Sequence, residues 1–305
     1  MPCQQTLLCQ QQQQQQHQVK PRANIHDIHQ AIIHGQVEKI RQILEQTPID
    51  LNATVCGSTA LSLSLNKCND AIFQLLLCTK NASKKPLDLN KLSKDEKHRL
   101  EPALLTACRL GNALAVRLLI KHGADLEAKD NFYHTAIWMA TRQRFKELVA
   151  YLITVGASVN PSSEWTHSPL YFAVRYSSHR AEIAKLLLLN GAPVFVHSAT
   201  RSILFCAIIE GNINIAHLIV EAGYNVSADV EIRHNLQTGM LTRSYSLLMW
   251  LKHESQNAPS LQRQCRTVIR TVISQNYNGT YFLKHMSQLP LPRSVISYLT
   301  LDCDI

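Results

Sequence analysis

The fold is decided by residues 135–157, which read TAIWMATRQRFKELVAYLITVGA. A hydroxyl residue, Thr135, stands before a short apolar run, where its side chain suits the N-cap of a first helix. A second apolar stripe follows a polar turn and ends at Gly156. Glycine readily adopts the left-handed conformation found one residue past a helix. The stretch therefore predicts two short antiparallel helices, neither of which can bury its apolar face alone.

The same pattern recurs along the chain. Units that begin at Pro102, Thr135, Ser168 and Ser202 start 33, 33 and 34 residues apart, and a glycine follows the second helix of each. Two less regular copies precede them, over residues 25–44 and from residue 57. A repeat of this length indicates a solenoid, in which units bury their apolar faces by stacking. We therefore expect an all-α fold with about six repeats and a degenerate one ending near residue 256.

A different pattern begins after residue 256. Ser260 can cap a helix in which Leu261, Cys265 and Ile269 recur at helical spacing. One interpretation is a terminal helix that only caps the last repeat, since a solenoid needs a cap. The other is a helix whose apolar stripe binds a partner.

A proline-rich segment follows this helix. Leu289-Pro290-Leu291-Pro292 can be neither helix interior nor central strand, because proline lacks the backbone donor and fixes φ. Residues that precede proline are held extended, so the segment is expected to display Leu289 and Leu291. Pro292 can then open a last short helix.

Both halves of the chain resemble known modules. The repeat resembles an ankyrin repeat, whose T-P-L-H-x-A core is matched by Ser168-Pro169-Leu170 and whose terminal Gly-Ala recurs at 123–124, 156–157 and 191–192. Residues 259–299 resemble a SOCS box in the Leu261, Cys265 and Ile269 spacing and in the L-P-Φ-P segment. Together, and in this order, they are similar to the ankyrin-repeat and SOCS-box family. The expected boundaries are a disordered Gln-rich tail over 1–23, ankyrin repeats over 24–256 and a SOCS box over 257–305.

The resemblance implies a function. In that family the SOCS box binds elongin C and elongin B and joins cullin-5 with its RING subunit, while the ankyrin array holds the protein to be ubiquitinated and degraded. The chain would be a non-catalytic substrate receptor. The alternative is an ankyrin scaffold, such as a transcription-factor inhibitor, without ligase function. Carried onto this sequence, the elongin-binding residues are Leu261, Cys265, Val268 and Ile269, and the cullin-binding residues are Leu289, Pro290, Leu291 and Pro292.

The resemblance also implies a substrate groove, lined by residues just before each first helix and near its end. These positions pair aromatic side chains with arginines, the residue types enriched at binding hot spots. An acidic target is expected because the groove carries several arginines. The alternative is that Phe132 and Trp165 only pack against neighbouring hairpins. The predicted groove residues are Phe132, His134, Arg142, Trp165, His167, Arg175, Tyr176 and Arg201.

Composition and motifs exclude several other classes of protein. The 305 residues carry a net charge of +9, but the basic residues are mostly spread singly, so no nucleic-acid partner is expected. The longest apolar run, 203–209, is too short to span a membrane. Metal-binding and catalytic motifs such as H-E-x-x-H are absent, so neither an enzyme nor a cofactor is expected. A lysine-rich insertion within 80–101 is predicted to be a solvated loop, with a docking loop for an acidic partner as the alternative.

The nine cysteines indicate the compartment. Their number is odd and no C-x-x-C pair occurs, which argues against a disulfide framework or a zinc module. A reducing compartment, the cytoplasm or possibly the nucleus, is therefore expected. Five cysteines within the repeats are predicted to be small core residues: Cys56, Cys68, Cys78, Cys108 and Cys206.

Overall fold

The computed structural model describes residues 24–79, 86–94, 98–160, 168–176, 180–194, 201–238 and 245–301. By its internal contacts the chain divides into two compact units, Met1–Ala103 and Leu104–Ile305. Each unit buries its own set of apolar side chains. The glutamine-rich segment 1–23 lies outside the described residues.

Two helix pairs make up the helical part of the first unit, within its described residues. Asn24 begins the first helix with a capping box: its side chain accepts hydrogen bonds from the backbone N–H groups of His26 and Asp27, and the Asp27 carboxylate accepts one from Asn24. The two irregular repeat copies are therefore helix pairs, as predicted. They are α2 (Ile25–Ile33) with α3 (Val37–Gln46) and α4 (Ala60–Asn66) with α5 (Asp70–Cys78).

The lysine-rich insertion contains a pair of short strands. Within it, β3 (Ser93–Lys94) pairs antiparallel with β4 (Leu100–Glu101). A second antiparallel pair, β1 (Thr54–Val55) with β2 (Ser58–Thr59), precedes α4 in the chain. The backbone N–H of Lys94 donates to the Gly57 carbonyl at 2.9 Å, and the side chains of Ser93 and Glu101 are buried. The prediction of a solvated loop is wrong for these residues, because strand pairing holds them against the repeat. Residues 80–85 and 95–97 lie outside the description.

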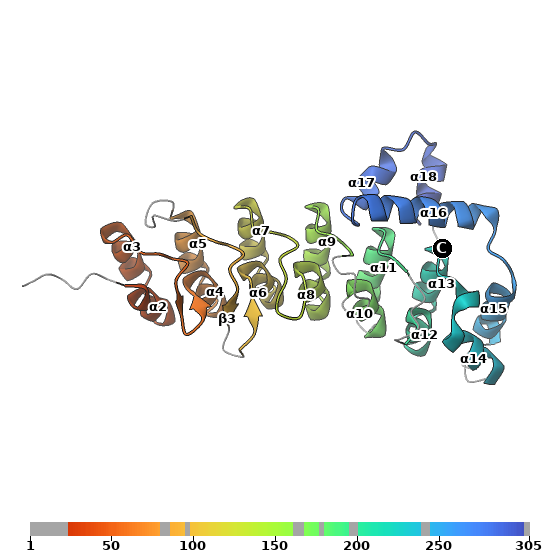
Figure 1. The fold of residues 1–305 in the computed structure, drawn as a ribbon, viewed down its shortest axis with the longest axis horizontal. Coiled ribbons are helices and arrows are strands. Elements are labelled where there is room, and N and C mark those ends of the chain that lie inside the picture. The colour runs from red at the N-terminus through yellow and green to blue at the C-terminus, as the bar shows by residue number, and fades with distance from the viewer. Residues whose placement is uncertain are drawn as a thin grey trace, which may run out of the picture. The chain divides into compact units, whose positions relative to one another are not determined.

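The second unit is a stack of helix pairs (Figure 1). The first helices α8, α10 and α12 pack side by side, as do the second helices α9, α11 and α13. This arrangement confirms the predicted all-α solenoid. The helices are α6 (Ala103–Leu110), α7 (Ala113–Lys121), α8 (Ala136–Gln143), α9 (Lys146–Thr154), α10 (Pro169–Arg175), α11 (Ala181–Leu189), α12 (Ile203–Ile209), α13 (Ile213–Glu221), the 3₁₀ helix η3 (Val226–Ala228), α14 (Val230–Thr238) and α15 (Tyr245–Gln256).

The expected helix signals are present with one exception. The hydroxyls of Ser168 and Ser202 accept hydrogen bonds from the backbone N–H groups three residues on, at 3.5 and 3.1 Å. Thr135 is the N-cap residue of α8, as predicted, but its buried hydroxyl makes no such bond and has no hydrogen-bond partner among the described residues. The repeat glycines adopt the left-handed conformation, with φ of 88° at Gly123 and 98° at Gly156.

The cysteine prediction is correct in part. Cys108 and Cys206 are buried in the repeat core. Cys56, Cys68 and Cys78 are exposed, so the prediction is wrong for these three. Cys56 and Cys68 both have a φ of 53°, because they lie in tight turns rather than on a buried helix face.

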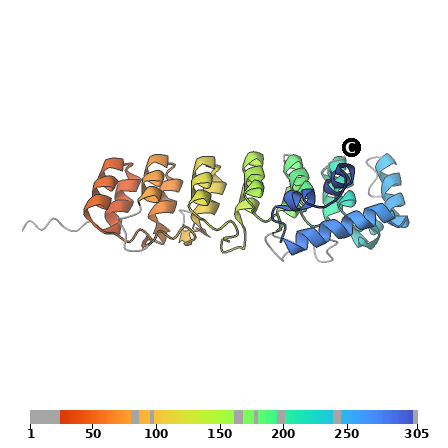
Figure 2. The same cartoon turned by 90° about the horizontal axis from the view of Figure 1, so that it is seen from above.

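Three further helices follow the last repeat: α16 (Leu261–Asn276), α17 (Phe282–Ser287) and α18 (Arg293–Thr300). Ser260 caps α16 as predicted, accepting a hydrogen bond from the Arg263 N–H at 3.3 Å. α18 begins directly after Pro292. The three helices enclose a small core of Ile273, Phe282, Met286 and Leu299. α16 runs across the paired helices of the stack, not along them (Figures 1 and 2).

Candidate functional site

One face of α16 is an apolar stripe left in solvent. Leu261, Cys265, Val268 and Val272 follow each other at i, i+4, i+7 and i+11, which places them on one side of the helix. Leu261 is 76% exposed and Val268 is 61% exposed, and the other two are also exposed. A contiguous apolar row that the fold does not cover is typical of an interaction surface. We call these four residues the α16 stripe.

The adjacent face of α16 belongs to the internal core of the C-terminal helices. Ile269 packs against the cluster formed by Ile273 and its neighbours on α17 and α18. The structure thus brings together three of the four predicted elongin-binding residues, Leu261, Cys265 and Val268, and turns Ile269 inward. Val272 replaces it on the exposed side. Its helical spacing is visible in the sequence, but it was not among the predicted elongin-binding residues.

The residues of the proline segment 289–292 also differ in exposure. Leu289 is partly buried against the same internal core, so the expectation that it is fully displayed is wrong. Leu291 is partly in solvent, and Pro290 and Pro292 are exposed. The segment therefore presents one leucine between two prolines, at the start of α18.

The third face of α16 is polar and contacts the repeats. Arg270 is only 4% exposed, and its guanidinium donates to two backbone carbonyls: from Nη1 to Leu299 at 2.8 Å and from Nη2 to Leu188 at 2.5 Å. Its charge also lies over the Phe282 ring, 4.9 Å from the centroid. Burial, and then the nearby charge of Arg266, lowers the pKa of Arg270 to about 9. One side chain thus joins α16, α18 and the end of α11.

Repeat glycines receive side chains from the C-terminal helices. A Cβ added to Gly191 would lie 2.4 Å from the Phe282 ring, and one added to Gly156 would lie 2.3 Å from Tyr281. A Cβ at Gly123 would meet nothing within 4 Å among the described residues. Two of these glycines therefore have a second role beyond ending a helix. Sequence could not reveal it, because all of them satisfy the same turn.

Hydrogen bonds and ion pairs complete this junction. Tyr281 donates from its hydroxyl to the Val155 carbonyl at 2.8 Å, and Ser274 donates to the Gly191 carbonyl at 3.0 Å. Arg263 bridges Glu254 at 2.5 Å and Glu221, at the end of α13, at 2.7 Å. The C-terminal helices therefore contact the ends of three successive second helices, α9, α11 and α13.

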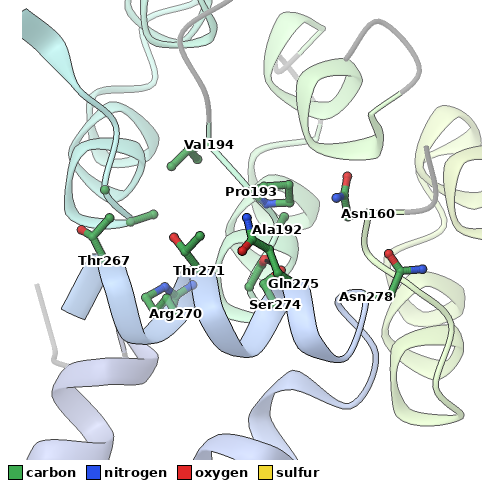
Figure 3. Close-up of a pocket in the computed structure, with 13 residues that line it drawn as sticks. Asn160, Ala192, Pro193, Val194, Thr267, Arg270, Thr271, Ser274, Gln275 and Asn278 are labelled. Atoms are coloured by element: carbon green, nitrogen blue, oxygen red, sulfur yellow. Dashed lines mark hydrogen bonds between the residues drawn. The ribbon is translucent and has the colours of Figure 1, made fainter. Parts of the chain in front are cut away.

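A cavity of about 230 Å³ lies within the same junction. Figure 3 shows Thr267, Thr271, Ser274 and Gln275 along α16 facing the turn that follows α11. The junction is thus held by directed polar contacts around an open space. Such contacts fix orientation through geometry more than through buried apolar area.

A second surface lies on the first helices of the repeats. The His134 ring stacks on Trp138 with centroids 3.5 Å apart, Trp138 contacts Phe172 at 5.1 Å, and Phe172 contacts Tyr176 at 4.8 Å. Phe132, 55% exposed, continues the row at 6.0 Å from His134. The structure thus connects three predicted groove residues, Phe132, His134 and Tyr176, through two rings that the prediction omitted.

Arginines lie over these rings. Arg142 lies 5.6 Å from the Trp138 centroid, Arg175 lies 5.6 Å from that of Tyr176, and Arg201 lies 5.7 Å from that of Phe205. Arg201 also approaches Glu231 at 3.7 Å. Trp165 and His167, the remaining predicted groove residues, lie outside the described residues. Trp138 could have been found from its register, since it occupies the fourth position of its unit, as Phe205 does.

Other kinds of site are not evident in the described part of the chain. No group of three or more His, Cys, Asp or Glu side chains there is placed to hold a metal ion. No helix among those residues is both long and apolar enough to cross a bilayer.

Comparisons with known proteins agree with a division of the chain into repeats and a separate set of C-terminal helices. A model of ankyrin repeats in three copies matches residues 87–163 and 104–197, and a SOCS-box model matches residues 257–300. The chain belongs to the ankyrin-repeat and SOCS-box family. Both parts are interaction modules, and their combination is that of a substrate adaptor of a cullin–RING ligase.

Solved structures show the same fold for the repeats. The ankyrin repeat domain of human ASB11 is 19% identical, with a TM-score of 0.53, covering 76% of this chain and 99% of that one. The ankyrin repeat domain of Bcl-3, a member of the IkappaB family, is 23% identical, with a TM-score of 0.54, covering 66% and 87%. An ankyrin repeat domain from Acinetobacter baumannii is 24% identical, with a TM-score of 0.54, covering 65% and 97%.

Proposed function

We propose that this chain is the substrate-recognition subunit of an elongin B/C–cullin-5–RING ubiquitin ligase. In this proposal the α16 stripe binds elongin C, and the proline segment 289–292 contributes to the choice of cullin-5. The ankyrin surface holds a target protein, which is ubiquitinated and then degraded. The ankyrin repeats span 24–256 and the SOCS box 257–305, and the complex acts in the cytoplasm or the nucleus.

The α16 stripe is the observation that carries the proposal. Two faces of α16 are occupied, one by the core of α17 and α18 and one by the repeats, yet the third face keeps four apolar residues in solvent. Burying one leucine such as Leu261 contributes about 1.5–3 kcal/mol. A few such anchors can dominate the affinity of an interface.

A scaffold without ligase function is the second candidate. The observation that favours it is the polar face of α16, which seals the ends of α11 and α13 as a terminal cap would. Capping and partner binding use different faces of the same helix, so the cap does not compete with the stripe. The two candidates differ only in what the stripe does.

Co-expression with elongin B and elongin C distinguishes them. The wild-type chain is expected to co-purify with both, whereas the Leu261→Ala/Cys265→Ala variant loses them while its circular dichroism is unchanged. Leu114→Ala is the matched control, since Leu114 is an exposed leucine on the repeat helix α7. Failure of the wild-type chain to retain elongins would favour the scaffold.

A further inference from the structure

The repeats bring arginines into register on their first helices. Three arginines follow one another at intervals of 33 residues: Arg109, Arg142 and Arg175. Each lies in the last turn of its helix, α6, α8 or α10. α8 and α10 pack side by side, so Arg142 and Arg175 occupy equivalent places on neighbouring helices. Packed helices lie about 8–10 Å apart. The two cations should therefore be separated by about that distance.

The obvious structural role for these arginines is already filled by another residue. Cations near a helix C-terminus can satisfy its free carbonyls. At α8 and α10 this is done by Arg180, which donates to the carbonyls of Thr141 at 3.1 Å, Arg142 at 2.7 Å and Tyr176 at 2.9 Å. Arg142 and Arg175 instead lie over the rings of Trp138 and Tyr176, which connect through Phe172. Their guanidiniums therefore face the aromatic row.

The charges of Arg142 and Arg175 are not neutralised by the described residues. No carboxylate among them lies within ion-pair distance of Arg142, Arg175 or Arg144, the C-cap residue of α8. The nearby Asp130 is engaged by His134 at 3.0 Å. Burial, and then the charges of Arg144 and Arg142, lower the pKa of Arg180, whose guanidinium donates to the Arg142 carbonyl. An anionic partner would relieve the mutual repulsion of these arginines.

The register ends at α12. The position equivalent to Arg175 is Ile209, which is 38% exposed, and Glu210 follows it. An acidic side chain would be repelled there, while an apolar one could be buried. The last three of these equivalent positions, on the consecutive first helices α8, α10 and α12, are thus two cations followed by an apolar residue.

We propose that this surface binds an acidic target segment in the polyproline II conformation, with carboxylates at positions i and i+3 against Arg142 and Arg175 and an apolar residue at i+6 against Ile209. A polyproline II chain has three residues per turn and rises about 3.1 Å per residue, so residues three apart share a face and lie about 9 Å apart. This matches the separation of packed helices. In a β-strand, residues three apart point to opposite faces. Aromatic-lined grooves favour the preformed polyproline II helix.

The inference rests on the proposed function only in taking the partner to be the target protein, and it names the chemical class of that target. Arginine suits this role because its planar fork can bind a carboxylate through two hydrogen bonds while its face stays on a ring. Lysine at the same positions would keep the charge and lose both features.

The test is peptide binding to the full chain, measured by fluorescence anisotropy. The probe is a labelled peptide containing Glu-Pro-Pro-Glu-Pro-Pro-Leu, and the control peptide has the same composition with the two glutamates adjacent. The first is expected to bind at least about tenfold more tightly, with an affinity that falls as salt rises. Arg142→Gln/Arg175→Gln should weaken binding of the first peptide at least about tenfold and remove the preference.

Arg117→Gln is the matched control variant, because Arg117 is an exposed arginine that lies over Tyr151 on a second helix. It should leave peptide binding unchanged. Equal binding of the two peptides, or binding unaffected by Arg142→Gln/Arg175→Gln, would overturn the proposal. Binding of a peptide with phosphoserine in place of the two glutamates, without binding of the glutamate peptide, would also overturn it. Co-purification with elongins, measured on the same variants, is expected to be unaffected, so loss of the ligase proposal would be seen separately.

Discussion

The guanidinium of Arg270 donates to the backbone carbonyl of Leu188 at 2.5 Å, across 82 positions of sequence. The bond joins the helix that carries the α16 stripe to the end of an ankyrin helix. Its second bond, to Leu299, holds α18 in the same arrangement. The stripe therefore has a fixed orientation relative to the last repeats. A substrate adaptor needs such an orientation, because it works by holding a target at a set place in its complex.

Replacing Arg270 should destabilise the fold. Arg270→Met leaves the Leu188 and Leu299 carbonyls without their charged donor, at a cost of about 1–3 kcal/mol for each buried group. Removing a buried charge offsets part of this, so the free energy of unfolding should fall by about 2–4 kcal/mol in urea titrations. Arg293→Ala, at an exposed arginine of α18, is the control and should change stability by less than about 0.5 kcal/mol. Equal stability of the two variants would contradict the role of Arg270.

The glycine contacts give a second stability prediction. Gly191→Ala and Gly123→Ala place a Cβ at similar left-handed φ values, 82° and 88°, so both incur the same backbone strain. Only Gly191→Ala adds a clash, with Phe282. It should be less stable than Gly123→Ala by about 1–3 kcal/mol, measured by urea unfolding. Limited proteolysis should also cut its segment 257–301 faster. Equal stability and equal rates of proteolysis of the two variants would mean that Phe282 does not pack against Gly191.

The faces of α16 predict different effects of mutation. Val272→Asp should leave thermal stability unchanged, because Val272 is exposed, yet weaken elongin binding at least about tenfold by placing an unpaired charge in the interface. Ile269→Ala should instead lower the free energy of unfolding by about 1–2 kcal/mol, since Ile269 is partly buried against the internal core. Thermal unfolding and a binding titration of each variant separate the two effects. The reverse pattern would show that the faces have been assigned wrongly.

The first unit should be sensitive to acid through His29. This side chain is buried, its Nε2 has no hydrogen-bond partner among the described residues, and burial, followed by the charge of His26, lowers its pKa to about 4. In the unfolded chain its pKa is about 6.5, so between these values the unfolded state binds more protons and stability falls as pH falls. The loss between pH 7 and pH 5 should be about 2 kcal/mol.

Urea unfolding at the two pH values measures this loss. His29→Leu should remove most of the difference, whereas His34→Leu, at an exposed histidine near the end of the same helix, should retain it. A pH dependence that survives in His29→Leu would assign the effect to another group.

Sequence predicted the repeats well because their signals are local. The turn at Gly156 and the caps at Ser168 and Ser202 depend on neighbouring residues, and all were found where expected. Predictions that depended on tertiary packing were less accurate. The spacing of Ile269 is equally compatible with the α16 stripe and with the core, and only α17 and α18 decide between them.

The candidate surfaces show the same limit. Leu289 was expected in solvent because proline extends the chain, but its side chain packs inward. Trp138 and Phe172 were omitted, although they connect the predicted groove residues, because the prediction took only the positions just before each first helix and near its end. The glycines that receive Tyr281 and Phe282 obey the same turn rule as Gly123, so sequence cannot tell them apart.

The most direct measurement is a calorimetric titration of the purified chain with the elongin B/C complex. The α16 stripe predicts saturable one-to-one binding with a negative heat-capacity change, as burial of apolar surface requires. Val272→Asp should weaken it, and Leu114→Ala should not. Absence of binding at about 100 μM of each component, where even a Kd near 1 μM would saturate, would contradict the assignment of the stripe as the ligase-binding surface.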